Sequence, residues 1–199
     1  YKGEFKNNLF GGKGKLIYKN GVYYIGQFKN NERNGKGKEY YPNGKLFFEG
    51  DFINGKYHGK GKYYDKNGQY FIEGEYINDQ IKKGKIYLPN GNLIYDGDFN
   101  NNVKEGIGKY YYDDGSYYIG QFKNDEINGK GKKYNEKNEL IYDGYFLDGK
   151  YEGKGKIYFK NGNYVAIETK NGNIINGNYS IFNNNGIFID TIEYKWNNN

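Results

Sequence analysis

The stretch Tyr24-Ile25-Gly26-Gln27-Phe28, followed by Gly35-Lys36-Gly37-Lys38 and closed by Pro42-Asn43-Gly44, decides the fold of this chain. The same order of residue types recurs along the sequence at a step of 23 or 24 residues. The counterparts of Gly26 are Gly3, Gly50, Gly74, Gly97, Gly120 and Gly144. A fixed period of this length indicates a repeat array, in which each repeat is one supersecondary unit stacked on its neighbours.

One period contains two strands and two turns. Tyr24, Gly26 and Phe28 alternate with Ile25 and Gln27, and a period of two residues is strand spacing. The polar run 30–34 predicts a turn, residues 35–41 predict a second strand, and residues 42–44 predict a tight turn into the next copy. No window carries an apolar stripe at helical spacing. Each repeat is therefore predicted to be a β-hairpin, and the fold class is all-β.

The glycine in the first strand predicts close packing, because a glycine that recurs inside a strand needs a structural reason. Without a side chain it leaves room for aromatic rings to lie flat on the backbone. Rings stand two residues before and two residues after it, on the same face of the strand. We predict that these rings line a partner-binding groove: Tyr24, Phe28, Phe48, Phe52, Tyr76, Tyr95, Phe99, Tyr118, Phe122, Tyr142 and Phe146.

The second strand of each repeat carries a pair of glycines followed by a lysine and, two residues later, usually by a tyrosine. The lysine and the tyrosine alternate with the glycines, so they are predicted to share the opposite face of the sheet. This lysine column is an alternative surface for anionic lipid: Lys15, Lys38, Lys62, Lys109, Lys132 and Lys156.

The pattern Tyr-x-Gly-x-Phe, then Gly-x-Gly, then Asn/Asp-Gly resembles the MORN (membrane occupation and recognition nexus) repeat, and His58-Gly59-Lys60-Gly61 matches the family's His-Gly-x-Gly signature. The resemblance implies an elongated, twisted, single-layer antiparallel sheet of stacked β-hairpins. Seven copies are predicted over residues 1–164. Residues 165–199 are predicted to be a degenerate eighth repeat and C-terminal cap, with Val165, Ile167 and Thr169 in the Tyr, Gly and Phe columns.

Two copies depart from the pattern. The fourth is one residue short and has Lys82-Lys83-Gly84 where Gly-x-Gly is expected. The sixth has Asn138 in place of the closing glycine, and asparagine tolerates the left-handed conformation that such a turn requires. The array begins inside a repeat at Tyr1, so we expect the chain to belong to a longer protein.

No catalytic, metal or cofactor site is predicted. The single histidine, His58, is expected to be a turn residue, and there is no cysteine. The Gly-Lys-Gly-Lys runs lack both the P-loop spacing and a following helix. The net charge is +6, with 24 acidic residues among the basic ones, which favours a solvated charged face and gives no indication of a nucleic-acid partner.

These features predict a non-catalytic scaffold or protein-interaction module that binds a helix or an extended segment of a partner, and free sheet edges could pair two copies as a homodimer. The family resemblance implies a role in cytoskeletal, ciliary or membrane-junction assembly, and hence a cytoplasmic location at the cytoskeleton, a cilium or a membrane. Two alternatives stay open: peripheral binding to anionic phospholipids through the Lys/Tyr face, or a regulatory repeat region of a larger enzyme.

Overall fold

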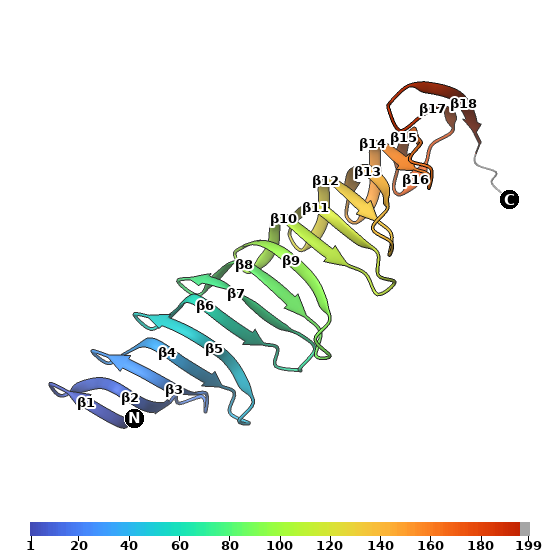
Figure 1. Ribbon diagram of the computed structural model, residues 1–199. Coiled ribbons are helices and arrows are strands. Elements are labelled where there is room, and N and C mark those ends of the chain that lie inside the picture. The colour runs from blue at the N-terminus through green and yellow to red at the C-terminus, as the bar shows by residue number, and fades with distance from the viewer. Residues whose placement is uncertain (196–199) are drawn as a thin grey trace. The chain divides into compact units, whose positions relative to one another are not determined.

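The computed structural model describes residues 1–195, which form 18 β-strands and no helix (Figure 1). The strands belong to an open antiparallel sheet in which consecutive strands form hairpins, so the predicted all-β repeat fold is confirmed. The chain divides into two compact units, Tyr1–Asn102 and Val103–Asn199, and the first contains β1–β9.

The strands of the first unit are β1 (Lys2–Lys6), β2 (Leu9–Ile17), β3 (Tyr23–Lys29), β4 (Glu32–Tyr40), β5 (Leu46–Ile53), β6 (Lys56–Tyr64), β7 (Phe71–Ile77), β8 (Gln80–Tyr87) and β9 (Leu93–Asn100). Those of the second unit are β10 (Val103–Tyr111), β11 (Tyr117–Lys123), β12 (Glu126–Tyr134), β13 (Leu140–Leu147), β14 (Lys150–Tyr158), β15 (Tyr164–Lys170), β16 (Asn173–Ile174), β17 (Gly177–Phe182) and β18 (Phe188–Tyr194).

Two kinds of turn alternate along the chain. Between β3 and β4 the turn has only two residues, Asn30 and Asn31, and both have positive φ (51° and 70°). Asparagine, aspartate and glycine adopt this conformation more readily than other residues, which suits them to two-residue hairpin turns. The predicted five-residue turn 30–34 is therefore wrong in extent, because β4 already begins at Glu32. The same shift places His58 inside β6, so its prediction as a turn residue is wrong.

The other turn is the predicted Pro-Asn-Gly turn, which is confirmed. Gly44 has φ +83°, and its amide donates a hydrogen bond to the carbonyl of Tyr41 over 2.9 Å. Asn138 occupies the matching position with φ 63°, as expected for an asparagine in place of the closing glycine.

A bulge in the second strand explains the first glycine of each Gly-x-Gly pair. Gly26 faces Gly37 and Phe28 faces Arg33, so residues 34–36 of β4 lie opposite Gln27 alone. The Gln27 side-chain oxygen accepts a hydrogen bond from the backbone amide of Lys36 (2.9 Å), and Gly35 within the bulge has φ +95°. Bulges bend a strand and strengthen its twist. Glycine is required at this position because the bulge gives it a positive φ.

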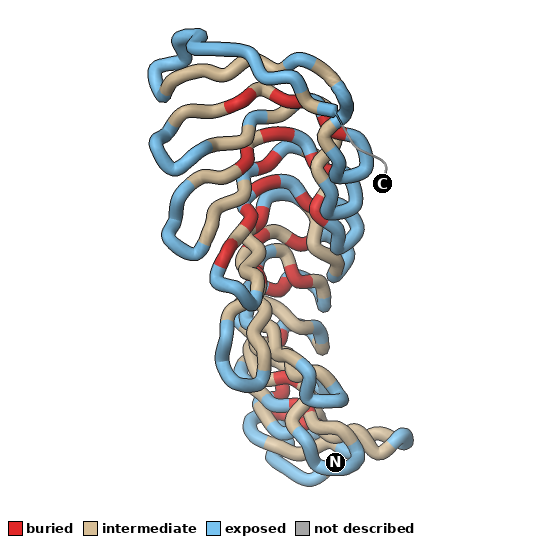
Figure 2. The backbone as a smooth tube through the Cα atoms, turned by 90° about the vertical axis from the view of Figure 1, so that its right-hand side faces the viewer, coloured by how far each residue is buried: buried red, intermediate tan, exposed pale blue. Residues whose placement is uncertain are grey.

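The aromatic columns form the core. Tyr24 and Phe28 are 0% and 4% exposed, and their rings meet edge to face with centroids 5.1 Å apart. Tyr24 also contacts Phe52 of the next hairpin at 4.9 Å. A Cβ atom built at Gly37 would lie 2.2 Å from the Tyr24 hydroxyl, so the ring covers the glycine backbone as predicted. Figure 2 shows buried residues within the strands and exposed residues at the turns.

The irregular copies fill the same space differently. In the fourth hairpin the Cδ1 of buried Ile81 lies 2.6 Å from the Cβ positions of both Gly74 and Gly84, where a tyrosine or phenylalanine ring lies in other hairpins. Farther along, Ile167 pairs with Gly155 in the glycine column, as the sequence predicted, and is 4% exposed. The assignment of residues 165–199 as a cap stays a prediction, and its last four residues lie outside the described part of the chain.

Candidate interaction surface

The residues predicted to line a groove lie in the core. All eleven are at most 6% exposed: Tyr24, Phe28, Phe48, Phe52, Tyr76, Tyr95, Phe99, Tyr118, Phe122, Tyr142 and Phe146. Their rings pack on one another and on the glycine backbone of their own hairpins. Side chains with so little exposed surface join hairpin to hairpin and leave almost no ring area for a partner.

The hydroxyls of four buried tyrosines, Tyr24, Tyr95, Tyr118 and Tyr142, are also hydrogen-bonded inside the sheet. The Tyr24 hydroxyl donates a hydrogen bond to the carbonyl of Gln27 (3.0 Å), and the Tyr118 hydroxyl donates to that of Gln121 (3.0 Å). Burial raises the pKa of Tyr24 to about 12. The Tyr24 hydroxyl therefore stays protonated to a higher pH than that of a tyrosine exposed to water.

A buried ionic cluster on the same face was not predicted. The Arg33 guanidinium lies 3.0 Å from the Glu39 carboxylate, and the Tyr57 hydroxyl donates a hydrogen bond to the other oxygen of that carboxylate (2.6 Å). Arg33 also donates to the carbonyl of Gly55 and lies 5.1 Å from the centroid of the Phe52 ring. Only the strand register brings these residues together, because most other hairpins carry an apolar or aromatic residue at each of the two positions. A buried pair with its hydrogen bonds satisfied costs little, whereas removing one partner strongly destabilises a fold.

The lysine column lies on the opposite face, where two kinds of contact hold its members. Three of the six predicted lysines form ion pairs with an acidic residue of the next strand: Lys38–Glu49 (2.8 Å), Lys62–Glu73 (3.0 Å) and Lys132–Asp143 (3.4 Å). The other three place their ammonium over a tyrosine ring: Lys15–Tyr23 (4.2 Å), Lys109–Tyr117 (3.7 Å) and Lys156–Tyr164 (4.4 Å). Carboxylates therefore neutralise part of this column.

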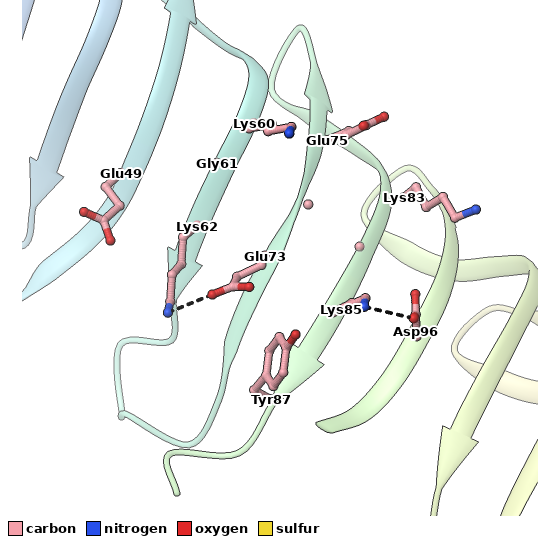
Figure 3. A pocket seen from close by; sticks show the side chains of 12 residues that line it. Glu49, Lys60, Gly61, Lys62, Glu73, Glu75, Lys83, Lys85, Tyr87 and Asp96 are labelled. Carbon is pink, nitrogen blue, oxygen red and sulfur yellow. Dashed lines mark ion pairs between the residues drawn. The ribbon is translucent and has the colours of Figure 1, made fainter. Parts of the chain in front are cut away.

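Three hollows in the first unit open on this face: one of about 460 Å³ beside Ile25, Lys36, Lys38 and Glu49, and two larger ones whose charges differ. One, of about 650 Å³, has backbone at Gly61, Gly74 and Gly84. Figure 3 shows the ion pairs Lys62–Glu73 and Lys85–Asp96 in it. Four lysines and four acidic residues line it: Lys60, Lys62, Lys83, Lys85, Glu49, Glu73, Glu75 and Asp96. We call it the balanced hollow.

The second hollow, of about 570 Å³, lies over β1–β4 and has no acidic lining residue. Its walls are Lys2, Lys13, Lys15, Lys36, Ile25 and Gln27, and its floor is Gly3, Gly14 and Gly26. We call it the lysine hollow. Ile25 is 44% exposed and stands where the balanced hollow has Glu49 and Glu73. The sequence could have predicted this difference in charge from the residue directly before the glycine of the first strand. That residue is acidic in four copies and isoleucine in two.

Two further searches cover the described residues. No group of three or more His, Cys, Asp or Glu side chains among residues 1–195 could hold a metal ion. In the same part of the chain no helix is long and apolar enough to cross a membrane.

Stacked hairpins whose rings cover a glycine column define a β-repeat protein. The sequence model of the MORN repeat matches residues 1–23, 24–45, 48–70, 95–117, 118–136 and 142–164, so the chain belongs to the MORN repeat family. The irregular fourth hairpin lies outside these matches. MORN repeats are in general modules for interaction with proteins or membranes, and MORN proteins are commonly membrane-associated or cytoskeletal.

Other comparisons add little. No curated protein matches the chain. Among solved structures, "KlHsv2 with loop 6CD replaced by a Gly-Ser linker" shows 8% identity over 94% of this chain and 70% of that chain, with a TM-score of 0.23. Kluyveromyces lactis Hsv2 shows 8% identity over 90% of this chain and 62% of that chain, with a TM-score of 0.18. TM-scores this low carry no argument about fold or function.

Proposed function

We propose that the chain is a non-catalytic scaffold that binds segments of partner proteins along its lysine face. One observation carries the proposal: hollows floored by bare glycine backbone open on this face. Glycine in a strand marks places where another backbone can approach closely. A partner segment can therefore lie against the sheet between lysine side chains.

This proposal moves the partner away from the aromatic columns. The sequence placed it among Tyr24, Phe28 and their counterparts, but these rings are buried. The half-buried tyrosines of the lysine face, such as Tyr40 and Tyr134, supply aromatic contact area there. Tyrosine is enriched in the centres of protein interfaces. Assembly at the cytoskeleton, a cilium or a membrane junction would then follow from the partner that the face selects.

The main alternative is a membrane surface. Each lysine near an anionic leaflet contributes about 1 kcal/mol of binding free energy. The acidic partners of Lys38, Lys62 and Lys132 lie within 3.4 Å and oppose this attraction. We therefore prefer a protein partner, whose own charges can match the pattern of lysines and acids. A regulatory role beside a catalytic domain is the remaining alternative.

Chemical crosslinking with mass spectrometry, applied to complexes isolated with the purified chain as bait, tests the proposal. The expected crosslinks to the partner start at lysines of the balanced hollow, such as Lys60 and Lys83. The turn lysines Lys19 and Lys160 serve as internal controls, because both are exposed away from the hollows. Crosslinks confined to the turn lysines would contradict the proposal. Sedimentation with anionic vesicles at about 0.15 M salt, without any protein partner, would favour the membrane alternative.

A further inference from the structure

The lysine hollow lacks the internal charge compensation of its neighbour. In the balanced hollow the acids of β7 and β9 stand beside lysines of β6 and β8, with Lys62–Glu73 at 3.0 Å and Lys85–Asp96 at 3.4 Å. In the lysine hollow the corresponding residue of β3 is Ile25, which pairs in register with Lys15 on one side and Lys38 on the other. The apolar side chain of Ile25 thus lies between lysines of the two neighbouring strands.

The free charge comes from three lysines. Lys36 already pairs with Asp51 at 2.7 Å, which leaves Lys2, Lys13 and Lys15 without a carboxylate partner in the salt bridges of the described residues. The nearby acid is Glu4 of β1, whose side chain accepts a hydrogen bond from the backbone amide of Lys13 (3.1 Å). Glu4 does not line the hollow. The recess therefore carries net positive charge.

We propose that the lysine hollow binds an acidic segment of a partner protein in which acidic residues flank one apolar residue. This deepens the function proposed above and rests on it. The charge of the wall selects the acids, and Ile25, 44% exposed, gives the apolar side chain a contact. Lys38 pairs with Glu49 at 2.8 Å and does not line the hollow, so the lysines that contact the acids are Lys2, Lys13 and Lys15. Acids at positions i and i+4 of an extended segment, with the apolar residue at i+2, lie on the same side of that segment and can face these lysines and Ile25 together.

The position equivalent to Ile25 in the second unit supplies a matched control. Residues 23–30 and 117–124 have the same sequence, Tyr-Tyr-Ile-Gly-Gln-Phe-Lys-Asn, so Ile119 lies in the same local sequence as Ile25. Ile119 is 39% exposed. The residue corresponding to Lys13 there is Ile107, which removes one of the charges that the proposal requires.

The test is isothermal titration calorimetry of the full chain with a synthetic peptide that contains two copies of the sequence Glu-Ser-Leu-Ser-Glu. Binding is expected, and it should weaken as salt rises from about 0.05 M to about 0.3 M because the charges are exposed. A peptide with glutamine in place of glutamate should bind at least ten-fold more weakly. Ile25→Glu, which introduces the acid of the balanced hollow, should also weaken binding at least ten-fold. Ile119→Glu, the same change in the same local sequence, should leave binding within two-fold.

Each contrary result overturns the inference. If the glutamate and glutamine peptides bind equally, charge does not select the segment. If Ile25→Glu and Ile119→Glu weaken binding equally, the binding site is not the lysine hollow. The double variant Lys13→Ala, Lys15→Ala should also weaken binding. It tests the same hollow in case Ile25→Glu does not fold. Vesicle binding that Ile25→Glu abolishes, without peptide binding, would assign the hollow to a membrane. If the peptide fails while partner crosslinks persist at Lys60 and Lys83, this inference fails and the proposed function stands.

Discussion

The packing of tyrosine on the glycine column makes a specific prediction for Gly120→Ala. A Cβ atom at Gly120 would lie 2.2 Å from the Tyr118 hydroxyl, 2.5 Å from the Cα of Gly131 and 2.6 Å from the carbonyl oxygen of Lys130. Two of these three contacts are with backbone atoms, so a rotation of the tyrosine cannot relieve them. The strands must separate locally, and the ring of Tyr118 must also move from its site.

The expected cost follows from two losses. Overpacking of a well-packed site typically costs about 1–3 kcal/mol. Displacement of Tyr118, which is 0% exposed, also breaks its hydrogen bond to Gln121, worth about 1 kcal/mol. The free energy of unfolding should therefore fall by about 2–4 kcal/mol. In a chain of 199 residues each kcal/mol corresponds to about 2–4 °C in Tm, which gives a decrease of about 5–15 °C.

Gly177→Ala is the matched control, because the nearest atom to a Cβ there is 3.6 Å away, an ordinary van der Waals contact. Its Tm should stay within about 2 °C of the parent or rise slightly, since alanine reduces the freedom of the unfolded chain. Thermal unfolding followed by circular dichroism, with urea titration for the free energies, measures both variants. Similar melting of the two would show that the tyrosine does not close the glycine column.

Three other perturbations test separate parts of the fold. Asp125→Ala should lower the free energy of unfolding by about 2 kcal/mol, because Asp125 has φ 69° and accepts a 2.9 Å hydrogen bond from the Lys104 amide; Asp125→Asn keeps both features and should be neutral in a urea titration. Hydrogen bonding from Lys38 holds the pKa of Glu49 below its ordinary 4.5, so the stability that it contributes is present above that pH and is lost as the pH falls through the lowered pKa; Glu49→Gln should reduce the loss of stability between about pH 6 and pH 3. Burial raises the pKa of Tyr24 to about 12, so its contribution to stability is full below pH 10 and is lost as the pH rises through 12; ultraviolet absorbance should show tyrosines that ionise late and together with unfolding, and ordinary titration of every tyrosine would contradict this.

The period and the alternation of residues were enough to predict the hairpins and the two faces of the sheet. Side chains two apart in a strand share a face whatever the tertiary structure, so Tyr24, Gly26 and Phe28 had to lie together. The glycine also predicted its covering ring, because only a residue without a side chain leaves that space. These inferences depend on local geometry alone, and the structure confirms them.

The burial of the aromatic rings could not be predicted from the alternation of residues. Alternation assigns Tyr24 to a face but does not say whether that face is open or covered. Its burial comes from contacts with Phe28 and with Phe52 of the next hairpin, combined with the bend at the bulge. The bulge depends on Gly35 having positive φ, and sequence reasoning assigned this glycine to a regular strand. An open groove was therefore predicted where the hairpins pack against one another.

Ring stacking alternates between neighbouring hairpins in part of the chain. Phe10, Tyr57 and Tyr151 stack face to face on a ring of their own hairpin at centroid distances of 3.8, 3.8 and 3.9 Å. The same position holds Arg33, Ile81 and Ile127 in the second, fourth and sixth hairpins, and none of these side chains forms such a ring stack. In the fifth hairpin, where the alternation would place a ring, the residue is Lys104. The stack therefore depends on the residue that each hairpin supplies at this position, and the fifth hairpin departs from the alternation of its neighbours.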